Sequence, residues 1–287
     1  MGTAYVHGYD PKEAQRLQDQ AGSLLELLHA DTAYPDGSSV LEAGCGVGAQ
    51  TVTLARNSAG AKITSFDLSE TSLTQARQAV ATAGLANVTL QQADILNLPF
   101  PPASFDHVFV CFVLEHLARP VEALQALKSM LKPGGTITVI EGDHGSTYFH
   151  PDSKYASRAV DCLVDLQAAA GGDALIGRRL YPLLTGAGFG EVRVSPRMVY
   201  VDDSKPALVD GFTRKTFTAM IEGVRRPAIE RGLMSAADFD RGIAELYRTA
   251  GGGGTFCYTF FKAIARLGPA GVRGGAAGEC GEVAAET

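Results

Sequence analysis

Residues 40–51 read VLEAGCGVGAQT and contain three alternating glycines, Gly44, Gly46 and Gly48. An apolar run precedes these glycines, and a helical pattern follows them. Glycine adopts the backbone conformations of a tight turn and lets a ligand approach the chain closely. The first turn of the following helix presents unbonded backbone N–H groups at the same point. The stretch therefore predicts a strand, a ligand-binding turn and a helix, in that order.

Short apolar segments alternate with helical patterns through the first half of the chain. The apolar segments lie at 63–66, 88–90, 105–112 and 136–140, and the helical patterns lie at 69–83 and 120–131. This alternation is typical of a parallel sheet with helices on both faces. Two later segments, 191–200 and 255–264, are rich in β-branched and aromatic residues and predict further strands. We therefore expect an α/β fold with a doubly wound sheet.

The remaining sequence predicts four regions. Residues 1–37 form an N-terminal helical lid segment, residues 38–203 and 251–266 form the ligand-binding domain, residues 204–250 form a helical insertion that acts as a substrate lid, and residues 267–287 form a tail. The tail is expected to be disordered because its Gly- and Ala-rich sequence has no periodicity. Within the domain, residues 142–152 read GDHGSTYFHPD and predict a loop, whereas 155–169 and 178–185 predict helices.

Composition narrows the class of partner. The chain of 287 residues has a formal net charge of −6, which argues against nucleic acid as a partner because phosphate binding requires clustered Lys and Arg. No apolar run reaches the roughly 18 residues of a membrane span, and the N-terminal residues do not resemble a secretory leader. The five cysteines are scattered without a pairing pattern and are expected to be reduced thiols. We therefore expect a cytoplasmic protein; the sequence carries no signal for its oligomeric state.

Acidic residues near the glycine turn discriminate between two ligands. Gly44, Gly46 and Ala49 also fit the G-x-G-x-x-G/A pattern of dinucleotide-binding proteins, and Asp67 lies at the right distance to bind a ribose hydroxyl. Glu42, however, puts a carboxylate beside a turn that would have to accept a pyrophosphate. A ligand with a cationic end fits better. S-Adenosylmethionine carries a sulfonium, an ammonium and a ribose, and no phosphate.

Residues 38–142 resemble the class I S-adenosylmethionine-dependent methyltransferases, in particular the branch of ubiquinone, menaquinone and natural-product methyltransferases. The resemblance rests on VLEAGCGVGAQT, on QADILNLPFPPASFDHVFVCFVLEHL and on LKPGGTITVIEG, in that order. It implies a Rossmann-like sheet of seven strands, mostly parallel with an antiparallel final strand. It also implies that S-adenosylmethionine lies across the carboxyl ends of the strands.

The resemblance assigns cofactor-binding roles by position. Glu42, Gly44, Cys45, Gly46 and Gly48 surround the methionine part, Asp67 holds the ribose, Leu68 packs on the adenine, Asp94 and Ile95 lie beside the adenine, and Cys111 and Phe112 lie near the sulfur. The oxygen of Asp94 is suited to accept a hydrogen bond from the adenine amino group. The family also closes its site with an N-terminal segment, which makes Tyr9 and Arg16 candidates for binding the methionine carboxylate.

The acceptor side is predicted from position alone. His144 follows the fifth strand at the carboxyl edge and is either a general base or a loop-stabilising residue. Residues expected to contact the acceptor are His116, Tyr148, Phe149, His150, Phe212 and Arg214. No metal site is expected, because His144 and His150 lack a recognisable ligand spacing.

The predicted reaction is methyl transfer to oxygen, nitrogen, sulfur or carbon of a small molecule, such as a natural product or a quinone. Fold alone does not assign the acceptor atom. Two alternatives stay open at this point: an NAD-dependent oxidoreductase that uses the same glycines, and a non-catalytic module that binds the cofactor.

Overall fold

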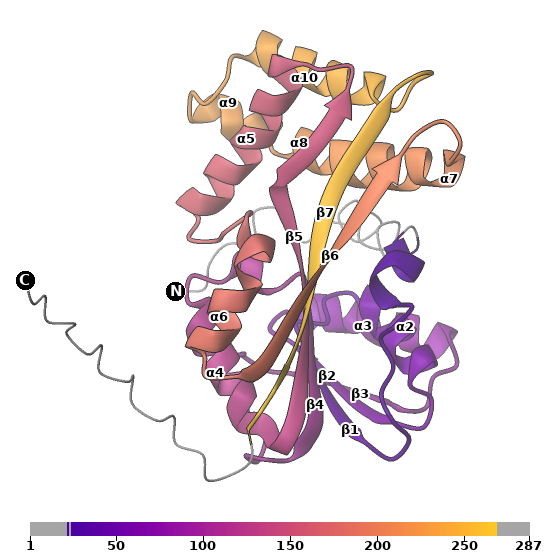
Figure 1. Ribbon diagram of the computed structural model, residues 1–287, viewed down its shortest axis with the longest axis vertical. Helices are drawn as coiled ribbons and strands as arrows, with labels where there is room; N and C mark the ends of the chain where they lie inside the picture. The colour runs from indigo at the N-terminus through magenta and orange to yellow at the C-terminus, as the bar shows by residue number, and fades with distance from the viewer. Residues whose placement is uncertain (1–21, 23, 269–287) are drawn as a thin grey trace, which may run out of the picture.

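A seven-stranded sheet forms the centre of the computed structural model, which describes residues 22 and 24–268 (Figure 1). Its strands are β1 Ser39–Ala43, β2 Lys62–Asp67, β3 Val88–Gln92, β4 Phe105–Cys111, β5 Leu131–His150, β6 Gly190–Val201 and β7 Thr255–Arg266. Their order is β3-β2-β1-β4-β5-β7-β6, with β7 antiparallel to both of its neighbours and the first five strands paired in parallel. The prediction of a doubly wound, Rossmann-like sheet with an antiparallel final strand is confirmed.

Helices cover both faces of this sheet. The helical elements are α2 Ala49–Asn57, α3 Glu70–Thr82, η1 Leu114–His116, α4 Pro120–Met130, α5 Lys154–Ala169, η2 Ile176–Arg179, α6 Leu180–Gly186, α7 Pro206–Leu208, the π-helical η3 Val209–Thr218, α8 Ala219–Gly223, α9 Arg225–Glu230 and α10 Ala236–Arg248. Figure 1 shows α2 and α3 on one side of the sheet and α4 and α6 on the other. Serine side chains at positions 69, 153 and 235 accept hydrogen bonds at the starts of α3, α5 and α10, as N-caps do.

One expectation about local structure is wrong. Residues 142–150 were expected to form a loop, but β5 continues through them to His150. The pairing with β7 shifts between Asp143 and Tyr148 and then resumes, with Tyr148 opposite Cys257 and His150 opposite Thr255. This pairing partner lies more than 100 positions away along the chain, so a local pattern rich in Gly, Ser and Asp gave no sign of it. Register shifts of this kind bend a strand without ending it.

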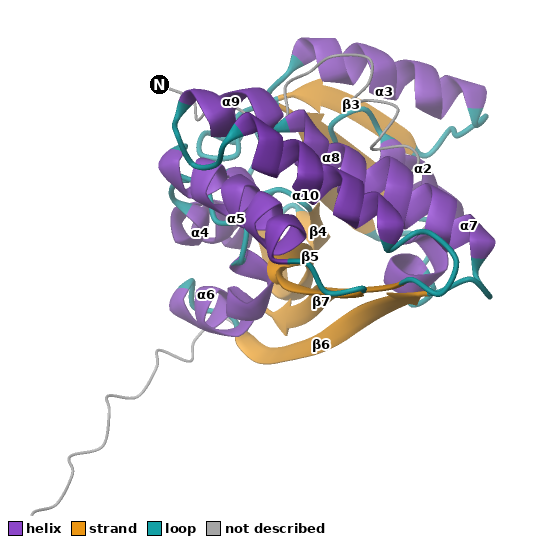
Figure 2. Ribbon diagram, turned by 90° about the horizontal axis from the view of Figure 1, so that it is seen from above, coloured by secondary structure: helices purple, strands orange, loops and turns teal. Residues whose placement is uncertain are grey.

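The extensions of β5, β7 and β6 carry a second layer of helices. Figure 1 shows these strands running beyond the other four, and Figure 2 shows α5, α8, α9 and α10 gathered over one face of them. The helices predicted between residues 206 and 249 are therefore present. We call α5 together with residues 206–248 the cap. In the part of the chain that the structure describes, no helix has the length and apolar character needed to cross a membrane.

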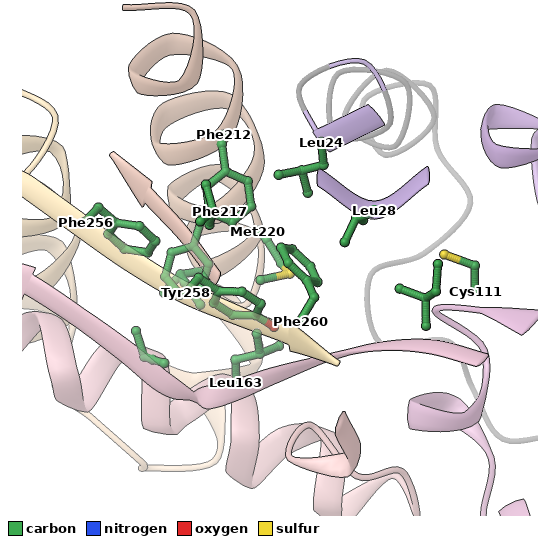
Figure 3. Close-up of a cluster of buried hydrophobic side chains, with 14 of the residues drawn as sticks. Leu24, Leu28, Cys111, Leu163, Phe212, Phe217, Met220, Phe256, Tyr258 and Phe260 are labelled. Atoms are coloured by element: carbon green, nitrogen blue, oxygen red, sulfur yellow. The ribbon is translucent and has the colours of Figure 1, made fainter. Parts of the chain in front are cut away.

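An aromatic cluster joins the cap to the sheet. Phe212 and Phe217 from η3 pack against Phe256, Tyr258 and Phe260 from β7, with ring centroids 4.7–6.0 Å apart (Figure 3). All five side chains are buried. Leu24 and Leu28, from the helical part of the N-terminal segment, belong to the same core. The insertion and residues 24–28 therefore share one hydrophobic core above the carboxyl ends of the strands.

We expect Phe212→Ala to destabilise the protein strongly. Phe212 is 1% exposed and touches three aromatic rings, and truncating such a side chain leaves a cavity that costs about 3–5 kcal/mol. The matched control is Tyr148→Ala on β5, because Tyr148 is 70% exposed and its loss should change the free energy of unfolding by about 0.5 kcal/mol or less. Urea denaturation of both variants measures the difference. Equal losses would show that the cap core does not stabilise the fold.

Candidate functional site

The glycine turn after β1 is closely packed on both sides. Gly44 has a φ of +67°, and a Cβ at this position would lie 2.6 Å from the Cγ2 of Val113, which follows β4. Gly48 has a φ of +81°, and its Cβ would lie 3.0 Å from the backbone of Ala76 in α3. Both positions combine a left-handed backbone with contacts that leave no room for a side chain. The turn therefore holds β1, β4 and α3 together at the carboxyl edge of the sheet.

Asp67, the last residue of β2, is bound to this turn. One carboxylate oxygen accepts a hydrogen bond from the Gly46 amide at 2.8 Å, and the other accepts from the Ser69 amide at 2.9 Å. A carboxylate has about four acceptor sites, so each oxygen retains the capacity for a second bond. Gln92 supports the same corner by donating to the Leu68 carbonyl at 2.9 Å. The arrangement suits a vicinal diol at the mouth of the turn.

Glu42 lies inside the protein beneath the turn. Its side chain is buried, and it accepts a hydrogen bond from the Ser65 hydroxyl on β2 at 2.6 Å. Burial raises the pKa of Glu42 to about 7, because a desolvated carboxylate is disfavoured and the neutral Ser65 compensates only in part. A cationic ligand near Glu42 would restore the charged form. An anionic ligand would instead favour the protonated form of Glu42 and gain no charge attraction from it.

An apolar surface continues from Asp67 toward β3. Leu68 is 61% exposed, which is unusual for a large aliphatic side chain beside a polar turn. Across from it, Ile95 packs partly against the core of the domain, and the Asp94 carboxylate accepts from the Leu96 amide at 2.9 Å. The exposed apolar side chain is suited to pack on a flat ring, and Asp94 supplies an acceptor near it.

The end of β4 is apolar and strained. Cys111 is buried, and burial raises the pKa of its thiol well above the usual value, so the sulfur stays neutral. Phe112 has a φ of +58°, and this left-handed conformation is energetically unfavourable for a residue that has a Cβ atom. Its amide donates to the Ile140 carbonyl at 2.9 Å, and its ring lies 5.6 Å from that of Phe260. The strained turn directs the chain from β4 into η1.

A group of buried polar side chains lies beyond this turn. Glu141, on β5, accepts hydrogen bonds from the Val113 and Leu114 amides at 3.0 and 2.8 Å and thereby caps η1. Glu115, in η1, has one carboxylate oxygen 3.6 Å from His116 Nε2 and the other 3.8 Å from His144 Nε2. We call Glu115, His116, Glu141, His144 and Tyr258 the Glu115 cluster. His116 and His144 were both predicted as site residues from the sequence. The structure brings them together around Glu115, which was not predicted.

Sequence reasoning missed three members of the Glu115 cluster. Glu115 and Glu141 each neighbour a motif residue, and each follows a predicted strand, so a search for buried carboxylates at strand ends could have found them. Tyr258 lies on β7, far from Glu115 and Glu141 along the chain. It is buried in the aromatic cluster, and its hydroxyl also lies 3.0 Å from His144 Nδ1.

The other predicted residues are dispersed. Tyr148 and His150 are exposed near the end of β5, and Phe149 stacks on Phe256 at 6.4 Å. Phe212 is in the core, and Arg214 donates to the Ala250 carbonyl at 2.7 Å. Acceptor binding by these residues stays a prediction. Tyr9 and Arg16 lie outside the described residues.

Two further expectations concern metals and thiols. Across residues 22 and 24–268, no group of His, Cys, Asp or Glu is arranged to hold a metal ion. Cys45, Cys111, Cys162 and Cys257 are free cysteines, as expected for reduced thiols; Cys280 lies outside the described residues.

Comparison with protein families matches the first half of the sheet. A family model described as a methyltransferase domain matches residues 41–139, the segment from β1 to β5 that contains the glycine turn, Asp67 and Cys111.

Three relatives show the range of similarity. A protein described as an uncharacterized 37.1 kDa protein in transposon TN4556 of Streptomyces fradiae is 34% identical over 200 residues, covering 69% of this chain and 56% of that protein. Methyltransferase GfsG of Streptomyces halstedii is 30% identical over 145 residues, 49% of this chain and 52% of GfsG. A demethylmenaquinone methyltransferase of Staphylococcus epidermidis is 36% identical over 107 residues, which cover 37% of this chain and 43% of that enzyme. The chain spans about half the length of the curated relatives it matches.

Solved structures share the fold at low identity. The [4+2]-cyclase SpnF aligns with a TM-score of 0.52 and 19% identity, covering 93% of this chain and 86% of SpnF. The chain also aligns with phosphoethanolamine N-methyltransferase 2 of Haemonchus contortus, solved in complex with phosphomonomethylethanolamine and S-adenosylhomocysteine. The TM-score is 0.53 at 17% identity, and the alignment covers 88% of this chain and 53% of that enzyme. Similarity at this level establishes a common fold.

The burial of Glu42 predicts a pH-dependent stability of the ligand-free protein. Between pH 4.5, its ordinary pKa, and about 7, the unfolded state releases the Glu42 proton while the folded state keeps it. The folded state therefore loses stability as the pH rises through this window, and the loss is constant above it. Glu42→Gln removes the titration. We expect this variant to exceed the wild type in unfolding free energy at about pH 8 by about 3 kcal/mol.

Urea denaturation across the pH range checks this expectation. Glu26→Gln, at an exposed position in the N-terminal segment, is the control and should follow the wild type at every pH. A stability difference for Glu42→Gln that does not grow between about pH 4.5 and 7 would contradict the assigned burial.

Proposed function

We propose that this chain, whose residues 41–139 belong to the class I S-adenosylmethionine-dependent methyltransferases, transfers the methyl group of S-adenosylmethionine to a small-molecule acceptor. The resemblance inferred from the sequence is confirmed by the family match and by relatives that are methyltransferases. The observation that carries the proposal is the Asp67 carboxylate, which is held by the Gly46 amide at the glycine turn with acceptor capacity to spare. Asp67 would accept from the ribose, and the turn that it binds is flanked by the buried acid Glu42.

The residues present fit the cofactor better than a dinucleotide. The methionine part would lie at Gly44, Cys45, Gly46 and Gly48, with its cationic groups toward the buried Glu42. The ribose would bind Asp67, and the adenine would lie between the exposed Leu68 and Ile95, with Asp94 at its amino group. A pyrophosphate at the same turn would have no cationic group near Glu42 and would disfavour its charged form. Glu42 therefore discriminates between the two ligands by charge.

Methyl transfer requires positioning more than covalent chemistry from the protein. When bound, S-adenosylmethionine supplies the methyl group on a positively charged sulfur. Cys111 and Phe112 would border this sulfur with apolar surface and exclude water from it. The acceptor atom must approach the methyl carbon in line with the bond that breaks, so the shape of the acceptor side sets much of the rate. The neutral Cys111 thiol would not compete as a nucleophile.

The acceptor class is proposed from the cap. The cap and residues 24–28 form an aromatic and aliphatic core above the carboxyl ends of the strands, which suits enclosure of a compact natural product or quinone. We propose that residues 1–37 and 204–250 act as lids on the domain formed by residues 38–203 and 251–266. The net charge of −6 disfavours nucleic acid as the acceptor. The free cysteines fit a reducing, cytoplasmic location.

Titration with S-adenosylhomocysteine and with NADH tests the cofactor assignment. Calorimetry should detect binding of S-adenosylhomocysteine and no binding of NADH. Tight NADH binding would instead favour an oxidoreductase, and binding of S-adenosylhomocysteine with no methyl transfer to any acceptor would favour a non-catalytic module.

Asp67→Ala should weaken S-adenosylhomocysteine binding. Losing hydrogen bonds to a charged acceptor costs about 1.5–3 kcal/mol, which corresponds to a Kd raised about 10- to 100-fold. Asp67→Asn keeps one acceptor oxygen and should give a smaller loss. The control is Asp36→Ala, since Asp36 is exposed and precedes β1 at the opposite edge of the sheet. A Kd for Asp67→Ala within about twofold of the wild type would remove Asp67 from the cofactor site.

A further inference from the structure

The Glu115 carboxylate lies between two histidines, and it is held in place by groups other than these histidines. Gln167 from α5 donates to one carboxylate oxygen at 3.3 Å and to the Glu115 backbone carbonyl at 3.0 Å. The Asp173 amide donates to the same carbonyl at 2.8 Å. The side chain is only 11% exposed. Its two oxygens therefore have fixed directions, one toward His144 and one toward His116.

His144 is engaged on both ring nitrogens. Nδ1 lies 3.0 Å from the Tyr258 hydroxyl and Nε2 lies 3.8 Å from Glu115. The Tyr258 hydroxyl is itself confined, because a Cβ at Gly142 would lie 2.4 Å from it. Burial raises the pKa of Tyr258 well above its usual value, so the hydroxyl keeps its proton and can donate to Nδ1. The neutral tautomer then carries its hydrogen on Nε2, facing Glu115. This geometry makes His144 a support for Glu115.

His116 has the more open position. Its side chain is 22% exposed against 7% for His144, and it belongs to η1, which directly follows the strained turn at Phe112. A residue that receives a proton from an acceptor must reach the space beside that turn. Of the two histidines, only His116 combines partial exposure with a carboxylate partner held by other residues.

We propose that His116 is the general base that removes the proton from a hydroxyl acceptor, with Glu115, His144 and Tyr258 as positioning residues. The inference rests on the proposed methyl transfer and names its acceptor class: a phenol or another hydroxyl that must lose a proton.

The proposed step is balanced in atoms and charge. The acceptor oxygen forms a bond to the methyl carbon while the carbon–sulfur bond breaks and its electron pair stays on sulfur. The O–H proton moves to the His116 ring. One positive charge disappears from the sulfonium and one appears on the imidazolium, next to the Glu115 carboxylate. A fixed negative charge at this place stabilises the charge that develops on His116 during the reaction.

Other titratable groups lie near η1. Glu141 on β5 accepts from the Val113 and Leu114 amides through one carboxyl oxygen, and burial together with the nearby Glu115 carboxylate raises the pKa of Glu141 well above its usual value, so it favours the protonated form. On η2, Arg178 pairs with Asp143 and Arg179 pairs with Asp173, and near α4 Arg119 pairs with Glu122. Glu115 is thus the carboxylate whose removal should change the titration of His116 most.

Nuclear magnetic resonance of the full chain tests the pairing without an acceptor. The opposite charge of Glu115 favours the imidazolium form of His116, so Glu115→Gln should lower the midpoint of the His116 titration by about one pH unit. Tyr258→Phe should change the titration of His144 and leave that of His116 within about 0.2 pH units of the wild type. A His116 midpoint that is the same with Glu and Gln at position 115 overturns the proposal.

Turnover tests the role of His116 directly, with S-adenosylmethionine and a set of phenols and hydroxyquinones as probes and release of S-adenosylhomocysteine as the signal. At about pH 7, His116→Gln should lower kcat about 100-fold or more, with the Kd for S-adenosylhomocysteine within about twofold of the wild type. The loss should shrink as the pH approaches the pKa of the phenol, because a phenolate needs no base. Glu115→Gln should lower kcat less than His116→Gln.

The controls separate this inference from the proposed function. His107→Gln, on the amino-terminal half of β4, should match the wild type in kcat and in binding. If the wild type fails to bind S-adenosylhomocysteine, the proposed function fails. If it binds and turns over, but His116→Gln retains kcat while His144→Gln loses it, the function stands and the assignment of the base to His116 is wrong. If the wild type binds S-adenosylhomocysteine but methylates none of the probes, the midpoint of the His116 titration in Glu115→Gln decides whether the pairing holds.

Discussion

The hydrogen bond between the Gly46 amide and the Asp67 carboxylate connects the turn after β1 to the end of β2. The Cys45 amide, which donates to the Phe66 carbonyl at 3.0 Å, fixes the same turn to β2, and the bond to Gly46 orients the Asp67 carboxylate at this edge of the sheet. The close contact of Gly44 with Val113 adds the end of β4 to the same unit. Three parallel strands therefore end at one corner, and the described residues proposed to bind the cofactor lie on these strands, on β3 or on the turns that follow them. Such rigidity lets a fixed set of acceptors and apolar surfaces recognise a flexible nucleoside.

Buried carboxylates give this corner its chemical character. Glu42 under the turn, and Glu115 and Glu141 beyond β4, are all buried. Burying a carboxylate costs free energy unless it is hydrogen-bonded or faces a positive charge, and a fold that retains three of them near one edge is suited to a cationic ligand. In the proposed complex, the sulfonium and ammonium of S-adenosylmethionine would supply such charges at Glu42, and an imidazolium formed during transfer would supply one at Glu115. Cofactor binding and catalysis would then use the same electrostatic bias on the two sides of the methyl group.

Much of this organisation was predictable from local patterns, and the part that was not depends on distant contacts. The glycine turn, Asp67 and the alternating strands and helices follow from short-range spacing, so their positions agree with the structure to within a few residues. The extension of β5 past Gly142 depends on pairing with β7, whose residues lie more than 100 positions away. The Glu115 cluster likewise joins Tyr258 to His144 across 114 positions. Sequence spacing carried no information about that contact, which is one of the observations on which the roles proposed for His144 and His116 rest.

The central claim is that the corner formed by Asp67, Glu42 and the glycine turn holds S-adenosylmethionine. A crystal structure of the full chain with S-adenosylhomocysteine tests it most directly. We expect both ribose hydroxyls within hydrogen-bond distance of Asp67, the ammonium on the Glu42 side of the turn and the sulfur beside Cys111 and Phe112. Density for the nucleoside at another edge of the sheet, or with the ribose turned away from Asp67, would contradict it.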